Sequence, residues 1–165
     1  MTLNPASPLA RLLAAPMRPG VVTWLGIRPR RLAPVVAVGH LDLEPGQGVA
    51  GDHYSSVTAG ARQVTIMAGE HLQAIASFLG LAQVPPEVLR RNVLVRGTNL
   101  LALKGRTMRL GMAVLEHSGE CHPCSKMEAA LGPGGYNAVR GHGGITARVL
   151  EAGMVRLGDT LEALP

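Results

Sequence analysis

The sequence predicts a mainly β fold: a closed, barrel-like and mostly antiparallel sheet with two or three short helices. Glycine and proline occur 21 and 12 times in 165 residues, so turns recur too often for a helical bundle. Aromatic residues make up only 2% of the chain, so its core must consist mainly of aliphatic side chains and methionine. About seven to nine short apolar segments separated by turn signals favour a sheet that closes on itself.

Short apolar segments bounded by glycine and proline predict the strands in the first half of the chain. They cover residues 20–29, 30–43 and 62–68. A loop at 44–60, rich in glycine and small polar residues, separates the last two, and a loop of that length is usually functional or mobile. Apolar residues then recur at helical spacing over 69–80, so we expect a helix that ends at Gly80.

The second half is predicted to contain hairpins. A helical turn that begins at Pro86 leads into a strand over Asn92–Val95. We expect a hairpin that turns at Lys104–Gly105, followed by a strand over 112–120. A second hairpin is expected to turn at Ala152–Gly153 and to lead into the final strand.

The chain is expected to form a single domain with an N-terminal arm. Residues 1–20 are predicted to be loose or short-helical, with arginines and no acidic residue. Residues 21–165 contain no repeat, low-complexity tract or linker, so we expect them to form one domain.

The charge of the chain favours an anionic ligand. It carries 16 lysine and arginine residues against 11 acidic residues, a net charge of +5, and 14 of the 16 are arginines. A guanidinium group binds phosphate or carboxylate through two parallel hydrogen bonds. Nucleic acid is not expected as a partner, because the arginines are scattered and the aromatic residues are too few for base stacking.

The sequence also predicts a cytoplasmic protein without membrane association. Proline and arginine interrupt residues 1–20, which therefore lack an apolar run of secretory length. No stretch approaches the roughly 18 apolar residues of a membrane helix. Two cysteines are too few for a disulfide framework, so a reducing compartment is the expectation.

The two cysteines, Cys121 and Cys124, have the spacing C-x-x-C. This spacing permits a redox dithiol, half of a zinc site, one working thiolate or an inert loop thiol. A thioredoxin-like dithiol wants a longer helix after the motif than this glycine-rich sequence allows. A zinc site needs four ligands, and adjacent Cys121 and His122 can hardly share one tetrahedron.

The two cysteines are not expected to be equivalent. Ser125 and Glu128 form an S-x-x-E capping box, which predicts a short helix with Ser125 as its N-cap. Cys124 then lies just outside the helix start, where the helix dipole and unpaired amides favour the thiolate. Cys121 lies farther out, so Cys124 is the expected nucleophile or metal ligand.

Five stretches of the chain follow one another in a recognisable order. They are GQGVAGDHY, RQVTIMAGEHL, VLRRNVLVRGTNLLALKG, MRLGMAVLEHSGECHPC and GGITARVLEAGMVRLGD. The chain resembles a MOSC domain, the module related to the C-terminal domain of molybdenum cofactor sulfurases, from residue 21 to about residue 162. The resemblance implies a β-barrel-like fold and one cysteine that ligates molybdenum or carries sulfur. That cysteine follows Pro123 and is Cys124.

The cofactor that this resemblance implies is the molybdenum cofactor. Its molybdopterin part carries a phosphate and a polar pterin, which need guanidinium and amide groups around them. By similarity, the candidate cofactor-binding residues are Arg91, Asn92, Asp52, His53, Arg62, Arg140 and His142.

Several of these candidates also have simpler interpretations. Arg91 could be a solvated surface cation, Asn92 could cap a turn, and His53 could be an ordinary loop histidine. Arg140 and His142 are flanked by glycines and could belong to a turn.

The chain departs from the larger sulfurases, which carry a domain with a pyridoxal-phosphate lysine. Its only lysines are Lys104 and Lys126, and we expect no pyridoxal phosphate on this chain. A sulfur carrier would therefore need a separate sulfur-donating protein, and a cofactor-bearing reductase would need a separate electron donor. The alternative is a thiol-redox or zinc-binding module that uses Cys121 and Cys124 without molybdenum.

Overall fold

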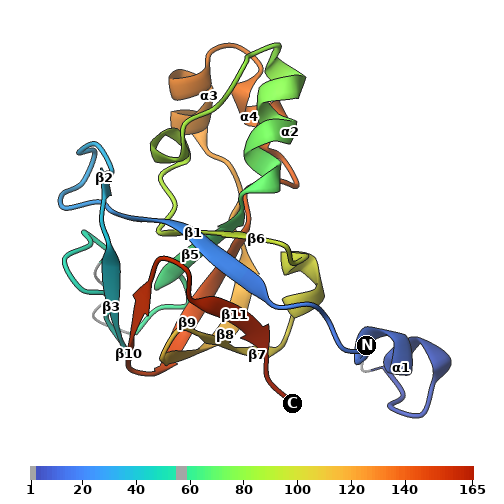
Figure 1. Ribbon diagram of the computed structural model, residues 1–165. Helices are drawn as coiled ribbons and strands as arrows, with labels where there is room; N and C mark the ends of the chain where they lie inside the picture. The colour runs from blue at the N-terminus through green and yellow to red at the C-terminus, as the bar shows by residue number, and fades with distance from the viewer. Residues whose placement is uncertain (1–2, 55–58) are drawn as a thin grey trace.

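The architecture is a closed β-barrel (Figure 1), seen in a computed structural model that describes residues 3–54 and 59–165. Within these residues seven strands close the barrel: β1 (Gly20–Ile27), β11 (Thr160–Ala163), β7 (Thr107–Leu110), β8 (Ala113–Glu120), β9 (Ile145–Glu151), β5 (Val64–Ala68) and β6 (Val93–Arg96). They neighbour one another in this order, and β6 pairs with β1 to complete the circle. All neighbours are antiparallel except β5 and β6, which run parallel. The predicted mainly β, barrel-like fold is confirmed.

A smaller sheet lies beside the barrel. It consists of β10 (Gly153–Arg156), β3 (His40–Glu44) and β4 (Gly48–Val49), in that order. The short strand β2 (Val36–Ala37) extends the barrel sheet by pairing with β1. In Figure 1 the small sheet stands at the side of the barrel opposite α1 (Pro8–Leu13).

Short helices cover one end of the barrel. The structure contains α2 (Glu70–Leu79), α3 (Ser125–Leu131), α4 (Gly135–Val139) and the 3₁₀ turns η1 (Pro86–Leu89) and η2 (Leu100–Leu103). Figure 1 shows α2, α3 and α4 together at the top, whereas α1 stands apart from the barrel. All residues of α1 are exposed or half-buried. The division into an N-terminal arm, residues 1–20, and one domain, residues 21–165, stays a prediction.

Two hydrophobic clusters explain this arrangement. Strand β5 is buried along its whole length because it separates them. Val64, Ile66 and Ala68 face the barrel interior, while Met67 packs with the helices. Aliphatic and methionine side chains fill both clusters, as the composition predicts. The helical cluster fixes α2, α3, α4 and η1 on the barrel end, where the candidate residues lie.

The hairpin predicted at Lys104–Gly105 is wrong. The preceding segment forms the 3₁₀ turn η2 rather than a strand, with Leu100 and Leu103 buried one turn apart. The Asn99 side chain caps this turn by accepting from the Leu101 amide. A short apolar run fits a 3₁₀ turn as well as a strand, which is why periodicity misled.

The hairpin predicted at Ala152–Gly153 is also wrong. Strand β10 pairs with β3 of the small sheet and not with β9. A Cβ atom at Gly153 would lie 2.3 Å from the Met112 carbonyl carbon and 2.4 Å from the Ala113 nitrogen. The chain therefore crosses tightly against the β7–β8 turn at this glycine and continues into the small sheet.

Asn92 joins three barrel strands from a fully buried position. Its Oδ1 accepts hydrogen bonds from the amide and the hydroxyl of Thr65, at 3.1 and 3.0 Å. Its Nδ2 donates to the Gly26 carbonyl at 3.2 Å. The side chain thus adds to the backbone bonds that Asn92 makes with Thr65 and Gly26, and it fixes the residues just before β6.

Replacing Asn92 by alanine is expected to destabilise the barrel. The substitution leaves the buried Thr65 amide and Gly26 carbonyl without a partner, which costs about 1–3 kcal/mol for each group. Urea unfolding should show a loss of at least about 1–3 kcal/mol for Asn92→Ala, and a loss within about 0.5 kcal/mol for the exposed control Asn137→Ala. Equal losses in both variants would mean that the Asn92 network is not needed.

Candidate functional site

Cys124 carries an exposed thiol at the start of α3. It is the N-cap of the helix, with extended backbone angles and no hydrogen bond from its side chain to the helix. The predicted capping box is wrong, because Ser125 is the first helical residue. Glu128 instead accepts hydrogen bonds from the amides of Gly134 and Tyr136, at 2.8 and 2.7 Å. These bonds lower the pKa of Glu128 and hold the turn between α3 and α4.

Arg91 is a buried cation behind Cys124. It is 6% exposed, and its guanidinium donates to the carbonyls of Gly143 (2.8 Å), Leu89 (2.6 Å) and Cys121 (3.4 Å). Burial lowers the pKa of Arg91. The negative charges of Cys121 and Cys124 in their deprotonated form oppose that change, and the positive charges of Arg28 and Arg62 reinforce it. Among the described residues it has no carboxylate partner. Arg91 therefore ties together the loop before β6, the cysteine segment and the loop after α4.

Arg90 belongs to the same group, although it is not among the residues predicted from the sequence. Its backbone is in the left-handed region, at φ 59°, where η1 ends. Nη1 donates to the Ala33 carbonyl at 2.7 Å. Burial and the charge of Arg28 lower the pKa of Arg90, whereas the charges of Asp52 and Cys124 raise it. The two adjacent arginines in the sequence do not by themselves indicate the position of Arg90. That position follows only from the backbone conformation, because one left-handed residue turns the two side chains apart.

Arg28 and Asp52 form a bidentate ion pair beside this group. Arg28 Nη2 lies 2.7 Å from Asp52 Oδ2, and Nε lies 3.1 Å from Oδ1. The Arg28 amide also donates to Oδ1 at 2.6 Å, and the Asp52 side chain is fully buried. Asn92 Nδ2 reaches the same Oδ1 at 3.4 Å, which connects the pair to the barrel network.

The predicted cofactor-binding residues comprise one buried group of three, three exposed residues and one residue that lies apart from both. Asp52, Arg91 and Asn92 converge behind Cys124, with every polar side chain engaged in protein hydrogen bonds. His53, Arg62 and Arg140 are exposed. Arg62 adds positive charge near Arg91, and Arg140 donates to Asn137 Oδ1 at 3.3 Å. His142 lies elsewhere, in a hollow beside the cysteine segment.

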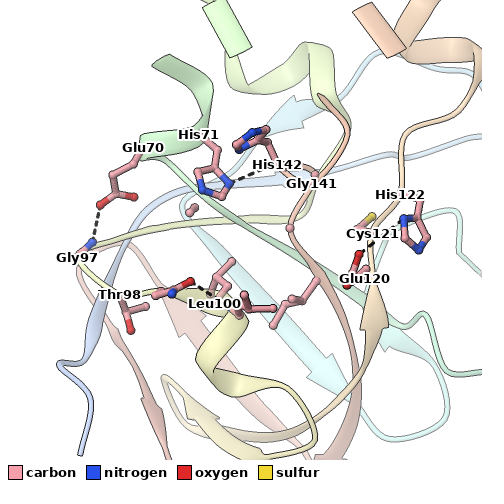
Figure 2. Close-up of a pocket in the computed structure, with 16 residues that line it drawn as sticks. Glu70, His71, Gly97, Thr98, Leu100, Glu120, Cys121, His122, Gly141 and His142 are labelled. Carbon is pink, nitrogen blue, oxygen red and sulfur yellow. Dashed lines mark hydrogen bonds and ion pairs between the residues drawn. The ribbon is translucent and has the colours of Figure 1, made fainter. Parts of the chain in front are cut away.

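Figure 2 shows this hollow, with His71 and His142 on one side and Cys121 on the other. Cys121 is 7% exposed, so its thiol is far less accessible than that of Cys124. The glycines that flank His142 have a packing role. A Cβ at Gly143 would lie 2.1 Å from the Cys121 carbonyl oxygen, and one at Gly144 would lie 2.1 Å from that of Ile66.

Two further observations concern metal clusters and membrane-spanning helices. Across residues 3–54 and 59–165, no three or more histidine, cysteine, aspartate or glutamate side chains gather closely enough to hold a metal ion. Of the helices that the structure describes, none is both long and apolar enough to cross a membrane.

Comparison with known proteins identifies the family. The family model of the MOSC domain matches residues 45–162, which is well over half of the chain. The chain belongs to the MOSC domain family. No curated protein matches it significantly. The matched region of this MOSC domain contains Asp52, Arg90, Arg91 and Cys124.

Solved structures share the fold of this MOSC domain. YuaD from Bacillus subtilis aligns with a TM-score of 0.76 at 23% identity, over 89% of this chain and 96% of that one. YiiM from Escherichia coli aligns with a TM-score of 0.66 at 20% identity, over 92% and 70% of the two chains. YiiM from Geobacillus stearothermophilus gives 0.65 at 17% identity, over 90% and 76%. At these identities the likeness concerns the fold.

Asp52 should make the stability of this MOSC domain depend on pH. Burial alone would raise the pKa of Asp52, but the hydrogen bonds and charge of Arg28 together outweigh it, so the pKa lies below 3.8. A carboxyl group whose pKa falls on folding stabilises the protein above its unfolded pKa. That contribution is lost as the pH falls through the folded pKa.

The measurement is urea unfolding of the wild type and of Asp52→Asn from about pH 6 down to about pH 2. The variant should be less stable by about 1–3 kcal/mol at pH 6, and the difference should shrink below about pH 4. Asp42→Asn, at an exposed position, should change stability by less than about 0.5 kcal/mol throughout. A difference for Asp52→Asn that stays constant with pH would contradict the pKa shift.

Proposed function

We propose that this chain acts in molybdenum cofactor chemistry through the thiolate of Cys124. In one form of the proposal the thiolate ligates the molybdenum of a bound cofactor, and in the other it carries sulfur for that cofactor. One observation carries the proposal: the exposed thiol of Cys124 lies close enough to Arg90 and Arg91 for its charge to interact with theirs. Membership of the MOSC domain family supports a role related to this cofactor.

The residues at the site fit an anionic cofactor with a soft metal. The charges of Arg90 and Arg91 interact with that of Cys124, and Asp52 pairs with neither of them but with the nearby Arg28. Among the described residues, Arg90 and Arg91 bond to carbonyl groups and to no carboxylate. A phosphate supplies the missing negative charge, and a thiolate is a donor that suits a soft transition metal.

The residues have distinct roles in this proposal. Cys124 is the ligand or carrier, and Arg90, with the exposed Arg62 and His53, binds the phosphate and pterin from the open side. Asp52 orients Arg28, and Arg91 holds the cysteine segment while adding its charge. Arg140 extends the positive surface. When bound, molybdenum would supply two-electron redox chemistry at a metal centre.

The exposure of Cys124 favours the carrier form as a second candidate. A donor protein must reach the sulfur-accepting atom, and an exposed thiol at a helix start allows such contact. A separate protein would then donate sulfur, since we assign no pyridoxal phosphate to this chain. The ligand form needs a separate electron donor instead. We place both in a cytoplasm, where the two unpaired cysteines stay reduced.

The same observation weighs against the dithiol and zinc alternatives. A dithiol needs two thiols that one partner can reach, but Cys121 is buried while Cys124 is exposed. A zinc site needs a closed set of ligands, and the described residues offer no such cluster. One working thiolate is the arrangement that the geometry supports best.

The proposal is tested by adding molybdenum cofactor to the purified chain and measuring molybdenum and pterin fluorescence per chain. Arg90→Ala removes a charge-assisted contact worth about 1.5–3 kcal/mol, so affinity should fall about 10- to 150-fold. Arg11→Ala, on the distant α1, should leave affinity unchanged. Equal affinity in the two variants would remove Arg90 from the site.

The cysteine variants separate the single thiolate from the pair in the same assay. Cys124→Ser should lose bound molybdenum, or persulfide after exposure to a sulfur donor, because an alcohol cannot replace a thiolate at neutral pH. Cys121→Ser should retain most of either. If both variants lose both properties together, the cysteines act as a dithiol or a shared metal site, and the proposal is wrong.

A further inference from the structure

The hollow in Figure 2 is separate from the arginine group around Cys124. It has a volume of about 730 Å³, within the range of about 300–1,000 Å³ that is usual for small-molecule sites. The start of α2, the turn η2 and residues 141–145 form its walls. Ala68, Leu100 and Ile145 give it an apolar floor. Its dimensions and floor suit an organic molecule rather than a single ion.

Aromatic rings form one side of the hollow. The rings of His71 and His142 meet edge to face, with centroids 4.7 Å apart at 86°. The ring of Phe78, which is 60% exposed, lies 5.3 Å from that of His142. His71 Nδ1 pairs with the His142 carbonyl at 3.3 Å. This cluster presents ring edges and faces against which a flat molecule can stack.

His142 has an unsatisfied polar atom in this cluster. Its Nδ1 is buried and lacks a hydrogen-bond partner among the described residues. Burial, and next the charge of His71, lower the pKa of His142, so its ring is neutral at neutral pH. A buried ring nitrogen without a partner loses free energy unless a ligand or water bonds to it. This atom has almost no accessible surface, so it lies within the ring cluster and not at the open face of the hollow.

The charges at the hollow select against anions. Glu70 and Glu120 line it, whereas no lysine or arginine does so in the part of the chain that the structure describes. Glu70 Oε1 accepts from the Gly97 amide at 2.7 Å, and Glu120 Oε2 lies 3.9 Å from His122 Nδ1. Each of these exposed carboxylates keeps a second oxygen that no described residue bonds, and a positive group can bind there. This balance is opposite to that around Cys124, so the two sites cannot share one anionic ligand.

We propose that this hollow is a second binding site, for a small aromatic molecule that carries a protonated amine or no charge. The aromatic ring lies against His71 and His142, over the apolar floor. The polar group faces Glu120, which lies across the hollow from Glu70 (Figure 2). The site is separate from the cofactor chemistry proposed for Cys124, because neither that thiol nor Arg28, Arg90 or Arg91 lines it; Arg91 contacts it only through the carbonyls of Cys121 and Gly143.

The test uses three probes of similar size on the cofactor-free chain: benzylamine, benzyl alcohol and benzoate. Nuclear magnetic resonance follows the ring protons of His71 and His142 as each probe is added. Benzylamine and benzyl alcohol should shift these signals, and benzoate should bind at least about tenfold more weakly than benzylamine. Benzoate binding as tightly as benzylamine, or no shift with any probe, would overturn the proposal.

Matched variants locate the binding. His71→Ala and His142→Ala each remove one ring that lines the hollow and should weaken benzylamine about two- to tenfold. His40→Ala, at an exposed histidine on the small sheet, should leave the affinity unchanged. Glu120→Gln should reduce the preference for benzylamine over benzyl alcohol. Unaltered affinity in both His71→Ala and His142→Ala would place the probe elsewhere and overturn the site.

One further variant separates this proposal from the function proposed for Cys124. Cys124→Ser should retain benzylamine affinity, whatever it does to molybdenum or persulfide. Loss of benzylamine binding in Cys124→Ser would show that the hollow depends on that thiol and would contradict an independent site.

Discussion

The buried guanidinium of Arg91 is the interaction on which the candidate site depends. A charged group removed from water is costly unless hydrogen bonds replace its hydration, and here three backbone carbonyls do so. Those carbonyls come from η1, the cysteine segment and the loop after α4. One side chain thus fixes three loops that are far apart in sequence. The same bonds bring the Cys121 backbone inward, while Cys124, three residues later, begins α3 in contact with solvent.

The arrangement around Arg91 also divides the barrel end into two chemical environments. On the side of Cys124, guanidinium groups outnumber carboxylates, and the one buried carboxylate belongs to the pair of Arg28 and Asp52. On the side of the hollow, carboxylates and imidazoles line an apolar floor. The tight approach of Gly143 to the Cys121 carbonyl, which no larger residue allows, keeps the wall between them thin. Neighbouring sites of opposite charge preference can serve two different molecules without competition between them.

Much of the fold could be predicted because it follows from local patterns. Segments such as β5 are continuous apolar runs, and Gly80 ends α2 in the left-handed conformation that glycine favours. The errors arose where partners are distant. The partner of β10 is β3, more than a hundred residues earlier, and no local signal encodes that pairing. The predicted capping box does not form, because Glu128 accepts hydrogen bonds from the amides of Gly134 and Tyr136, beyond the end of its helix.

The candidate site could likewise be predicted only where local sequence patterns determine it. The unequal exposure of the two cysteines agrees with the inequality expected from the sequence, although the helix begins one residue earlier than expected. The contribution of Arg90 was missed because it depends on one left-handed backbone residue. Arg28 was missed because its partner, Asp52, lies in another loop. His142 was grouped with the cofactor residues by its sequence neighbours, yet its ring packs against His71 and Phe78.

The central claim is that one exposed thiolate, Cys124, works within a cationic site while Cys121 serves only the fold. Its most direct test is the rate at which iodoacetamide labels each cysteine, followed by mass spectrometry with and without molybdenum cofactor. Cys124 should be labelled faster than Cys121, and the cofactor should slow labelling at Cys124 alone. Faster labelling of Cys121, or a rate at Cys124 that the cofactor leaves unchanged, would contradict the account.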